Sequence, residues 1–441
     1  MRHIAVVGSG PAGCYLADGL LRNAKDSRID IIDRLPTPFG LVRCGVAPDH
    51  QSTKAVTRLL ERTLARPEVG FFGGVELGRD VMLEELRDLY DGVVLATGAS
   101  RDRRLGIPGE DLLGVFPSGR FVGWYNPHPD HAEVDLSAVR SVVVIGNGNV
   151  ALDVARILAK TTDEFRGSDL DPSIAAAIDA APIRQIHIVG RRAARHMKFT
   201  PLELSEFGEL GRARPLLAAG HDLEGIEGAA SGALRTVCER PYSADRIEIR
   251  FAFGMTPLRF VGNASGRLSA VRFRNEDGHE SELAAELAVT CIGYETSGHG
   301  LAVENGALAN EGGRIAEGLY AVGWARRGPS GTIPTNRTEA QELALRLLSE
   351  LSDGNKRGGT GLHEIVERRE IACIDYAGWR RIDASEIAGA GEARCRRKWR
   401  SMHQLFAAAT ASAEEAPDGD RDRAAARRPE ADARAVARAP L

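Results

Sequence analysis

A short apolar stretch runs directly into a glycine-rich turn at the start of the chain, and the same order of features returns near residue 141. Residues 4–7 (IAVV) read as a buried strand, residues 8–13 (GSGPAG) have the form G-x-G-x-x-G, and helical spacing follows to about residue 23. A second strand at residues 29–32 completes a β-α-β unit. The second unit has a strand at 141–145 (SVVVI), a turn at 146–151 (GNGNVA), a helix to about residue 160 and a strand at 185–189. Two such units predict an α/β fold with two dinucleotide-binding domains.

Composition narrows the class of protein further. The chain has 441 residues, a net charge of -4 and six cysteines that form no C-x-x-C pair. The length predicts two or three domains, the charge argues against a basic nucleic-acid binder, and the cysteine spacing excludes a zinc ribbon and a thioredoxin-reductase-type disulfide. Because no apolar run is long enough for a membrane span and residues 4–7 leave no room for a signal peptide, we predict a cytoplasmic protein.

Further strands are expected at residues 92–96, 250–253, 268–273, 287–292 and 319–322. Residues 412–441 consist mostly of Ala, Arg, Asp, Glu and Pro, so we predict a disordered tail there. We place the domain boundaries so that residues 1–105 and 293–411 form one domain, with a C-terminal extension, and residues 106–292 form an inserted one.

The first glycine turn has the parts of a dinucleotide site. Gly8 permits a tight turn, Gly10 lets the backbone approach a pyrophosphate, and Gly13 lets the helix pack closely on the strand. Asp33 follows at the end of the next strand, where a carboxylate can accept from a ribose hydroxyl. We interpret this turn as the site of flavin adenine dinucleotide (FAD); the alternative is a glycine turn without a ligand.

The second glycine turn differs from the first in the residues after its second strand. No acid stands there, and Arg191 and Arg192 do. Guanidinium groups can bind a 2′-phosphate but cannot accept from a 2′-hydroxyl. The pattern therefore predicts NADP rather than NAD, the alternative being a solvated arginine pair on a loop.

Longer strings go beyond this general pattern. They are residues 35–50 (LPTPFGLVRCGVAPDH), 121–126 (FVGWYN), 146–158 (GNGNVALDVARIL), 322–324 (VGW) and 327–329 (RGP). On these strings the chain closely resembles the adrenodoxin reductase-like ferredoxin–NADP reductases, over about residues 1–345. The resemblance implies a glutathione-reductase-like flavoprotein fold, in which an NADP domain is inserted into an FAD domain.

The resemblance also implies roles for individual residues. FAD contacts, mostly through backbone apart from the carboxylate, would come from Ala12, Asp33, Leu41 and Leu77. The isoalloxazine would pack on Trp324, and amides at its polar edge would come from Gly331, Thr332 and Ile333. NADP contacts would come from Asn147, Gly148, Asn149, Val150, Arg191 and Arg192, with Arg103 a further candidate. Glu203 and Glu206 would lie near the nicotinamide. His50 would pair with Glu206 through solvent, and these two are the expected catalytic residues, which would tune and hydrate the site. We expect no metal ion.

Two of these interpretations have plain alternatives. A histidine in a Pro-Asp-His turn is often a turn or capping group, so His50 has a structural role as its alternative. Arg195 and Lys198 extend the Arg191–Arg192 pair into a basic cluster. That cluster is either a phosphate clamp with solvated charge or a docking patch for an acidic ferredoxin.

The expected function is hydride transfer from NADPH to FAD, followed by single-electron transfer to a ferredoxin-like iron–sulfur protein. The alternatives are a redox-sensing flavoprotein that binds NADP without sustained turnover, and an NADPH diaphorase or reductase subunit with another acceptor. We expect a monomer that binds no nucleic acid.

Overall fold

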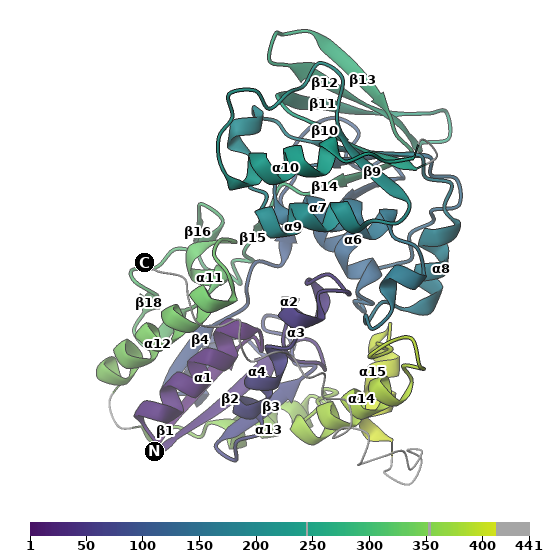
Figure 1. Cartoon of the computed structure of the whole chain (residues 1–441). Coiled ribbons are helices and arrows are strands. Elements are labelled where there is room, and N and C mark those ends of the chain that lie inside the picture. Colours follow the sequence, from purple (N-terminus) through teal and green to yellow (C-terminus); the bar gives the residue numbers. More distant parts are fainter. Residues whose placement is uncertain (244–245, 352–353, 412–441) are drawn as a thin grey trace, which may run out of the picture.

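The computed structural model describes residues 1–243, 246–351 and 354–411, which form two lobes (Figure 1). The predicted disordered tail, residues 412–441, lies outside the described residues. The first lobe is the lower one in Figure 1 and contains the N-terminus, and the second lobe is the upper one. Each lobe is built on a six-stranded sheet.

The sheet of the first lobe has the order β18-β19-β4-β1-β2-β3 and is parallel except for its edge strand β18. Its strands are β1 (Arg2–Val7), β2 (Ser27–Asp33), β3 (Val69–Gly73), β4 (Gly92–Leu95), β18 (Arg314–Ala316) and β19 (Leu319–Ala321). The helices packed on one face are α1 (Pro11–Asn23), α4 (Thr57–Leu64) and α12 (Ile333–Glu350), and those on the other are α5 (Leu83–Leu89) and α13 (Gly359–Arg368). Strand β1 therefore lies inside a helix-covered sheet, which explains its continuous apolar run.

The sheet of the second lobe is entirely parallel, with the order β6-β14-β7-β8-β10-β9. Its strands are β6 (Val115–Pro117), β7 (Ser141–Ile145), β8 (Gln185–Val189), β9 (Ala213–Leu217), β10 (Ile247–Ala252) and β14 (Leu287–Thr290). One face packs against α6 (Ser118–Tyr125), α7 (Asn149–Ala159), α8 (Pro172–Ala180) and α10 (Ala229–Glu239). The other face is covered by an antiparallel sheet of β11 (Met255–Gly262), β12 (Leu268–Asn275) and β13 (Glu280–Ala284).

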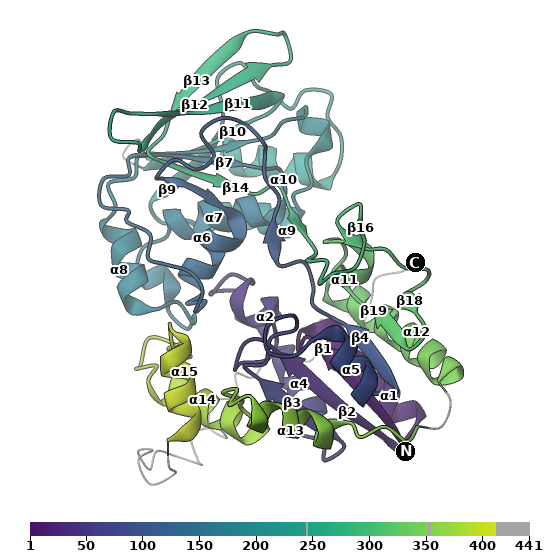
Figure 2. The same ribbon diagram turned by 180° about the vertical axis from the view of Figure 1, so that it is seen from behind.

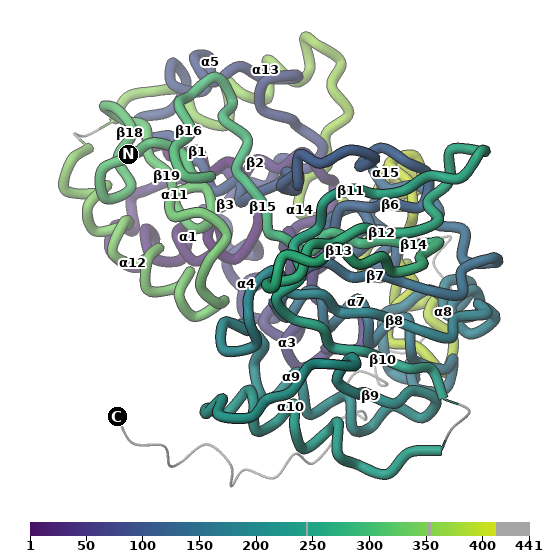
Figure 3. The backbone as a smooth tube through the Cα atoms, turned by 90° about the horizontal axis from the view of Figure 1, so that it is seen from above, coloured from purple at the N-terminus to yellow at the C-terminus, as the bar shows by residue number. Residues whose placement is uncertain are grey.

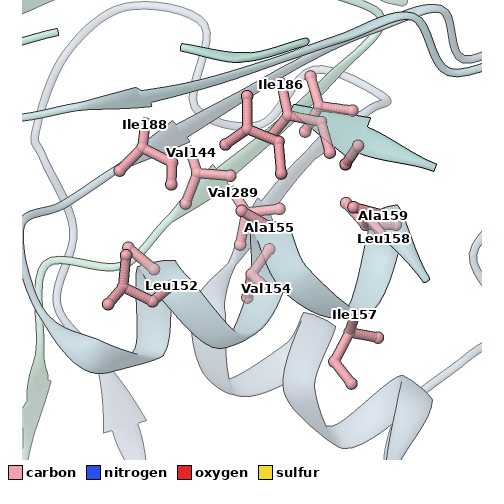
Figure 4. Close-up of a cluster of buried hydrophobic side chains, with 14 of the residues drawn as sticks. Val144, Leu152, Val154, Ala155, Ile157, Leu158, Ala159, Ile186, Ile188 and Val289 are labelled. Atoms are coloured by element: carbon pink, nitrogen blue, oxygen red, sulfur yellow. The ribbon is translucent and has the colours of Figure 1, made fainter. Parts of the chain in front are cut away.

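The core beneath α7 shows how this lobe is held together (Figure 4). Val144, Ile186 and Val289 from neighbouring strands meet Leu152 and Ala155 of the helix, and all five are fully buried. The apolar positions of α7 thus face the sheet at helical spacing, which leaves its polar positions for the boundary between the lobes.

The two lobes are connected through the two-stranded ribbon β5 (Arg101–Asp102) and β15 (Tyr294–Glu295), where the chain leaves the first lobe and returns to it (Figure 3).

Short elements around the boundary are α2 (Leu41–Cys44), α3 (Gln51–Lys54), α9 (Pro201–Ser205) and α11 (Trp324–Arg327). A small hairpin consists of β16 (Val303–Glu304) and β17 (Ala307–Leu308). Three 3-10 turns span Asp163–Phe165, Ala194–His196 and Glu206–Glu209. The C-terminal part ends in α14 (Tyr376–Ala388) and α15 (Met402–Thr410).

All the expected strands are present, with small differences at their ends. Residues 96, 291–292 and 322 lie just beyond β4, β14 and β19, and β10 spans Ile247–Ala252 rather than residues 250–253. The start of β10 was missed because Glu248 interrupts the apolar pattern, although it pairs with β8 on one side and β9 on the other. Within the described residues, we find no helix that combines the length and the apolar character of a membrane span.

Candidate functional site

The first glycine turn follows the central part of the first sheet. Val7 pairs with Ile32 of β2 and with Leu95 of β4, so the turn leaves the carboxyl end of a strand with neighbours on both sides. In open α/β sheets this position is where ligands bind. The predicted glycine turn and α1 are therefore placed as a dinucleotide site requires.

Three glycines of this turn have distinct surroundings. Gly8 has φ +116°, and a side chain there would collide with the Ala96 carbonyl oxygen. A Cβ at Gly13 would collide with the Gly8 carbonyl oxygen, whereas a Cβ at Gly10 would meet nothing within 4 Å. Gly10 is also the N-cap of the 13-residue helix α1. The turn is tightly packed on its protein side and open at the residue that would face a pyrophosphate.

Asp33 lies beside this turn, as predicted. The Ser9 amide donates to Oδ2 of Asp33 at 2.8 Å, and the Leu35 amide donates to Oδ1 at 3.0 Å. The carboxylate is thus oriented by two backbone groups at the end of β2. A carboxylate has further acceptor capacity for a ribose hydroxyl.

The three other predicted FAD contacts differ in their surroundings. Ala12 lies against Gly323, the residue before Trp324, because a Cβ on Gly323 would come within 2.6 Å of the Ala12 Cβ. Leu41 is 45% exposed at the start of α2. Leu77 is only 6% exposed and packs in the core beneath the sheet, so its side chain already has a structural role. A contact from Leu77 to the cofactor would therefore use backbone atoms, and this role stays a prediction.

The predicted isoalloxazine side of the site is formed by α11 and the start of α12. Trp324 Nε1 donates to the Ser330 carbonyl at 2.9 Å, and the indole stacks on Tyr294 with ring centres 6.2 Å apart and planes 21° from parallel. Gly331 and Thr332 are exposed, and Thr332 is the N-cap of α12. Its amide already donates to Thr335 Oγ1 at 3.1 Å.

The second glycine turn is packed against the segment that carries the two glutamates. Asn149 opens α7 and exchanges two bonds with Thr200: the Thr200 amide donates to Asn149 Oδ1 at 3.0 Å, and Asn149 Nδ2 donates to Thr200 Oγ1 at 3.2 Å. The Lys198 amide donates to the Asn147 carbonyl at 2.9 Å. A Cβ at Gly148 would meet nothing within 4 Å, so this turn is open like the first one. Val150 is half-buried in the first turn of α7.

The four cations that follow β8 have exposed side chains. In the part of the chain that the structure describes, Arg191, Arg192, Arg195 and Lys198 form no ion pair and no side-chain hydrogen bond with protein. Arg103 has a different location, because it follows β5 and its Nε donates to the Tyr294 carbonyl of β15 at 3.0 Å. The structure therefore leaves the four cations after β8 available to a phosphate. The role of Arg103 toward NADP stays a prediction.

His50 meets both predicted glutamates across the boundary of the lobes. Its Nε2 lies 3.0 Å from Glu206 Oε2 and 3.8 Å from Glu203 Oε2. His50 is the N-cap residue of α3, but its side chain makes no capping bond. The imidazole is thus directed at the glutamates, and its contact with Glu206 is direct, where we had expected solvent between them.

Sequence reasoning missed the charged partners of this group. Arg156 is nearly fully buried and lies 2.9 Å from Asp153, 3.0 Å from Glu206 and 2.9 Å from His50 Nε2. Its guanidinium and the ammonium of Lys160 both bind Asp49. A usable signal was present: Asn149, Asp153, Arg156 and Lys160 recur at spacings of four, three and four, so they share one face of α7.

These charges shift the protonation of the three central groups. Burial raises the pKa of Glu203 to about 7, and the nearby Asp153 carboxylate adds to the effect. For His50, burial lowers the pKa, but the bond to Glu206 and the charges of Asp153 and Asp49 outweigh it, so the pKa is raised. For Glu206, burial raises the pKa, but His50 and Arg156 outweigh it, so the pKa is lowered.

These shifts favour the charged forms of His50 and Glu206, whereas the carboxyl of Glu203 changes charge near neutrality. His50, Glu203 and Glu206 are also the one group of three potential metal ligands among the described residues. The Arg156 guanidinium beside them opposes a second cation at that position.

Comparison with known proteins identifies the family. Residues 2–207 match the family described as pyridine nucleotide-disulphide oxidoreductase. The chain is 38% identical to cindoxin reductase of Citrobacter braakii over 415 residues, which cover 90% of this chain and 88% of that protein. The chain belongs to the adrenodoxin reductase-like ferredoxin–NADP reductases. The family assignment confirms the predicted oxidoreductase class and the predicted pair of cofactors, FAD and NADP.

Two further members of this family support the assignment. The mitochondrial NADPH:adrenodoxin oxidoreductase of Arabidopsis thaliana is 35% identical over 440 residues, which cover 87% of this chain and 90% of that protein. The structure of Mycobacterium tuberculosis FprA in complex with NADPH has a TM-score of 0.87 and 33% identity, and covers 93% of this chain and 100% of that one. These matches confirm the predicted fold class, and they extend the resemblance beyond residue 345.

Proposed function

We propose that this chain is an FAD-dependent ferredoxin–NADP reductase that oxidises NADPH and reduces a ferredoxin-like iron–sulfur protein. The observation that carries the proposal is the contact of His50 with Glu206, because it joins the lobe of the first glycine turn to the lobe of the second. Each turn leaves the carboxyl end of a strand that has a parallel neighbour on both sides. Such positions bind nucleotides, and here two of them belong to lobes that meet at one group of titratable residues.

The residues of the first lobe fit FAD. Gly10 leaves open space before the N-terminus of α1, where amide groups can bind a pyrophosphate. Asp33 is held beside the same turn as an acceptor for ribose. Ala12, Leu41 and Trp324 lie near this turn or at the boundary of the lobes, and the role of each toward the cofactor is part of the proposal.

The residues of the second lobe fit NADP. Gly148 is open in the same way as Gly10, and four cations without acid partners among the described residues follow β8. A phosphate dianion satisfies such cations, whereas a ribose hydroxyl does not need them. We assign Arg191 and Arg192 to the 2′-phosphate.

FAD, when bound, accepts a hydride from NADPH and passes on electrons singly, which suits an iron–sulfur cluster that takes one at a time. The chain's own residues contribute placement and charge. The two lobes orient the two rings, and such positioning can supply most of the rate. His50 lies next to both Glu206 and Glu203, and the shifted pKa values of these three groups set the charge next to the proposed nicotinamide position.

The relatives that support this acceptor class are named cindoxin reductase, NADPH:adrenodoxin oxidoreductase and NADPH-ferredoxin reductase. We propose an acidic iron–sulfur protein as the partner of this chain. A cytoplasmic location, a monomeric state and the domain limits at residues 105/106 and 292/293 stay predictions.

The test uses the purified holoprotein. We expect about one FAD per chain, bleaching of the flavin by NADPH under anaerobic conditions, and sustained reduction of cytochrome c only when a ferredoxin is present. A redox sensor would be bleached once and would hardly turn over, and a diaphorase would reduce dyes but no ferredoxin. A folded protein that cannot be loaded with FAD would refute the proposal itself.

A further inference from the structure

The C-terminal part of the chain crosses from the first lobe to the second. We call residues 389–400, which join α14 to α15, the C-terminal strap. Figure 2 shows its yellow-green path rising from beside the first lobe toward α8 of the second lobe. The Cys395 amide donates to the Ser168 carbonyl at 3.0 Å, and the Gly167 amide donates to the Ala393 carbonyl at 2.9 Å. The strap is therefore bound along the second lobe by its backbone.

One side chain of the strap is bonded to both lobes. Lys398 is 1% exposed in its side chain, and its Nζ donates to the Arg43 carbonyl of α2 at 3.0 Å. The same ammonium lies 2.9 Å from Asp169 Oδ2 and 3.3 Å from Asn126 Oδ1, both in the second lobe. A buried ammonium must have its donors satisfied, so Lys398 holds these three groups together.

A lysine from the first lobe completes the arrangement. Lys54 of α3 donates to both Asp169 oxygens at 2.8 Å and to Asn126 Oδ1 at 3.2 Å. Burial raises the pKa of Asp169, but the two ammonium groups outweigh it, so the carboxylate stays ionised. One buried carboxylate of the second lobe is thus shared by Lys54 of the first lobe and Lys398 of the strap, and burial together with the charge of Lys398 lowers the pKa of Lys54.

The other end of the strap is fixed to the first lobe beside the proposed FAD contacts. Glu386 of α14 is fully buried, accepts from Arg43 Nη2 at 2.6 Å and accepts from the Trp399 amide at 3.0 Å. Arg43 belongs to the same short helix as Leu41. The strap therefore connects a segment at the proposed FAD site to the second lobe without passing through the β5–β15 ribbon.

We propose that Lys398 is a positioning residue for hydride transfer, because the C-terminal strap fixes the NADP lobe against the FAD lobe in the orientation that the transfer needs. The inference rests on the proposed function. The β5–β15 ribbon is narrow, and two lobes joined by such a connection can rotate about it. Lys398 and Lys54 both bind Asp169 of the second lobe, and these bonds restrain that rotation.

The test replaces Lys398→Met in the holoenzyme and follows four measurements. They are bound FAD per chain, NADPH affinity, the long-wavelength absorption of stacked nicotinamide and flavin rings, and hydrogen exchange of the Gly167 and Cys395 amides. We expect FAD content and NADPH affinity to stay within about twofold, because their contacts lie elsewhere. The stacking absorption should weaken, both amides should exchange faster, and the rate of flavin reduction should fall on the order of ten- to a hundredfold.

Two further variants separate positioning from general stability. Arg380→Met is the matched control, since Arg380 is an exposed residue of α14 that pairs with Glu61 of the first lobe at 2.6 Å and lies outside the strap. It should leave all four measurements near those of the wild type. Lys398→Arg retains the charge and should recover most of the rate.

If Lys398→Met does not fold, Arg394→Met provides a milder change, because it removes one bond from the strap to the Leu170 carbonyl. It should give the same pattern with a smaller fall in rate. Unchanged exchange and stacking in a folded Lys398→Met variant would overturn the proposal. If NADPH fails to bleach the flavin of the wild type, the proposed function fails, and the exchange measurement still decides whether the strap holds the lobes.

Discussion

The imidazole Nε2 of His50 lies 3.0 Å from Oε2 of Glu206, although the two residues belong to different lobes. The first comes from the turn before α3 and the second from the turn after α9. Their contact needs both lobes in place, so the protonation of His50 reports on the assembled site.

Removing the charge of Glu206 should lower the pKa of His50. In the Glu206→Gln variant the main group that favours the imidazolium is lost, and burial together with Arg156 then favours the neutral ring. We expect the His50 titration, followed by the imidazole NMR signals or by the pH dependence of flavin reduction, to move to lower pH. Glu209→Gln is the control, because Glu209 lies in the same turn and is 81% exposed. An unmoved titration would contradict the pairing.

Glu203 should make the folded protein lose stability as pH rises. Its pKa is raised from 4.5 to about 7 in the folded state, so folding favours the protonated carboxyl. The stabilising effect is complete below pH 4.5 and disappears as pH rises toward about 7. Glu203→Gln cannot ionise, so it should be more stable than the wild type at pH 8, by about 1–2 kcal/mol for this partly solvated group.

Urea unfolding of the FAD-bound protein at pH 5.5 and pH 8 checks this expectation. The advantage of Glu203→Gln should be clearly smaller at the lower pH. An advantage that is the same at both pH values would show that Glu203 does not titrate in this range.

Replacing both Arg191 and Arg192 by glutamine should remove the preference for NADPH. Charge-assisted bonds contribute about 1.5–3 kcal/mol each. Losing two should reduce the ratio of kcat/KM for NADPH to that for NADH on the order of a hundredfold. KM for NADPH should rise much more than kcat falls, because the 2′-phosphate is distant from the reacting ring.

Arg259→Gln is a suitable control for that experiment, since Arg259 is exposed on β11 of the same lobe. This control should leave kcat/KM unchanged for both NADPH and NADH. If the double variant kept its NADPH preference but lost ferredoxin reduction, the arginines would belong to the docking patch that we considered as the alternative.

Alanine substitutions at two glycines of the first turn should affect different properties, FAD affinity in one variant and folding stability in the other. Gly10→Ala meets no protein atom and keeps an ordinary φ of -68°, so stability without FAD should change by less than about 1 kcal/mol. FAD affinity should fall by more than about tenfold, because the new methyl group would occupy the space for the pyrophosphate.

Gly13→Ala would collide with the Gly8 carbonyl oxygen and should destabilise the fold by about 2 kcal/mol or more. Thermal unfolding of the FAD-free proteins and flavin titration separate the two effects. Equal FAD affinity in Gly10→Ala and the wild type would exclude this turn as the flavin site.

Local patterns predicted the glycine turns, eight of the twelve strands in the two six-stranded sheets and the cations after β8. Each depends on residues within about one strand or one helix of one another, so periodicity and turn chemistry carry the information. The face of α7 that bears Asp153 and Arg156 is local in the same sense, because its charged positions recur at helical spacing. The partners of that face are not local, since Asp49, His50 and Glu206 come from distant parts of the chain.

The tertiary structure decided which charges meet. Lys54, Asp169 and Lys398 are far apart in the sequence and form one buried group, and Arg156 reaches Asp49 from another lobe. No local pattern marks such pairs, because their side chains become neighbours only when the two lobes and the C-terminal strap have packed. The amino-acid sequence by itself therefore determined the two nucleotide-type units and the coenzyme preference. The packing of the lobes determined the titration of His50 and Glu203, since burial and the charges of distant residues set those pKa values.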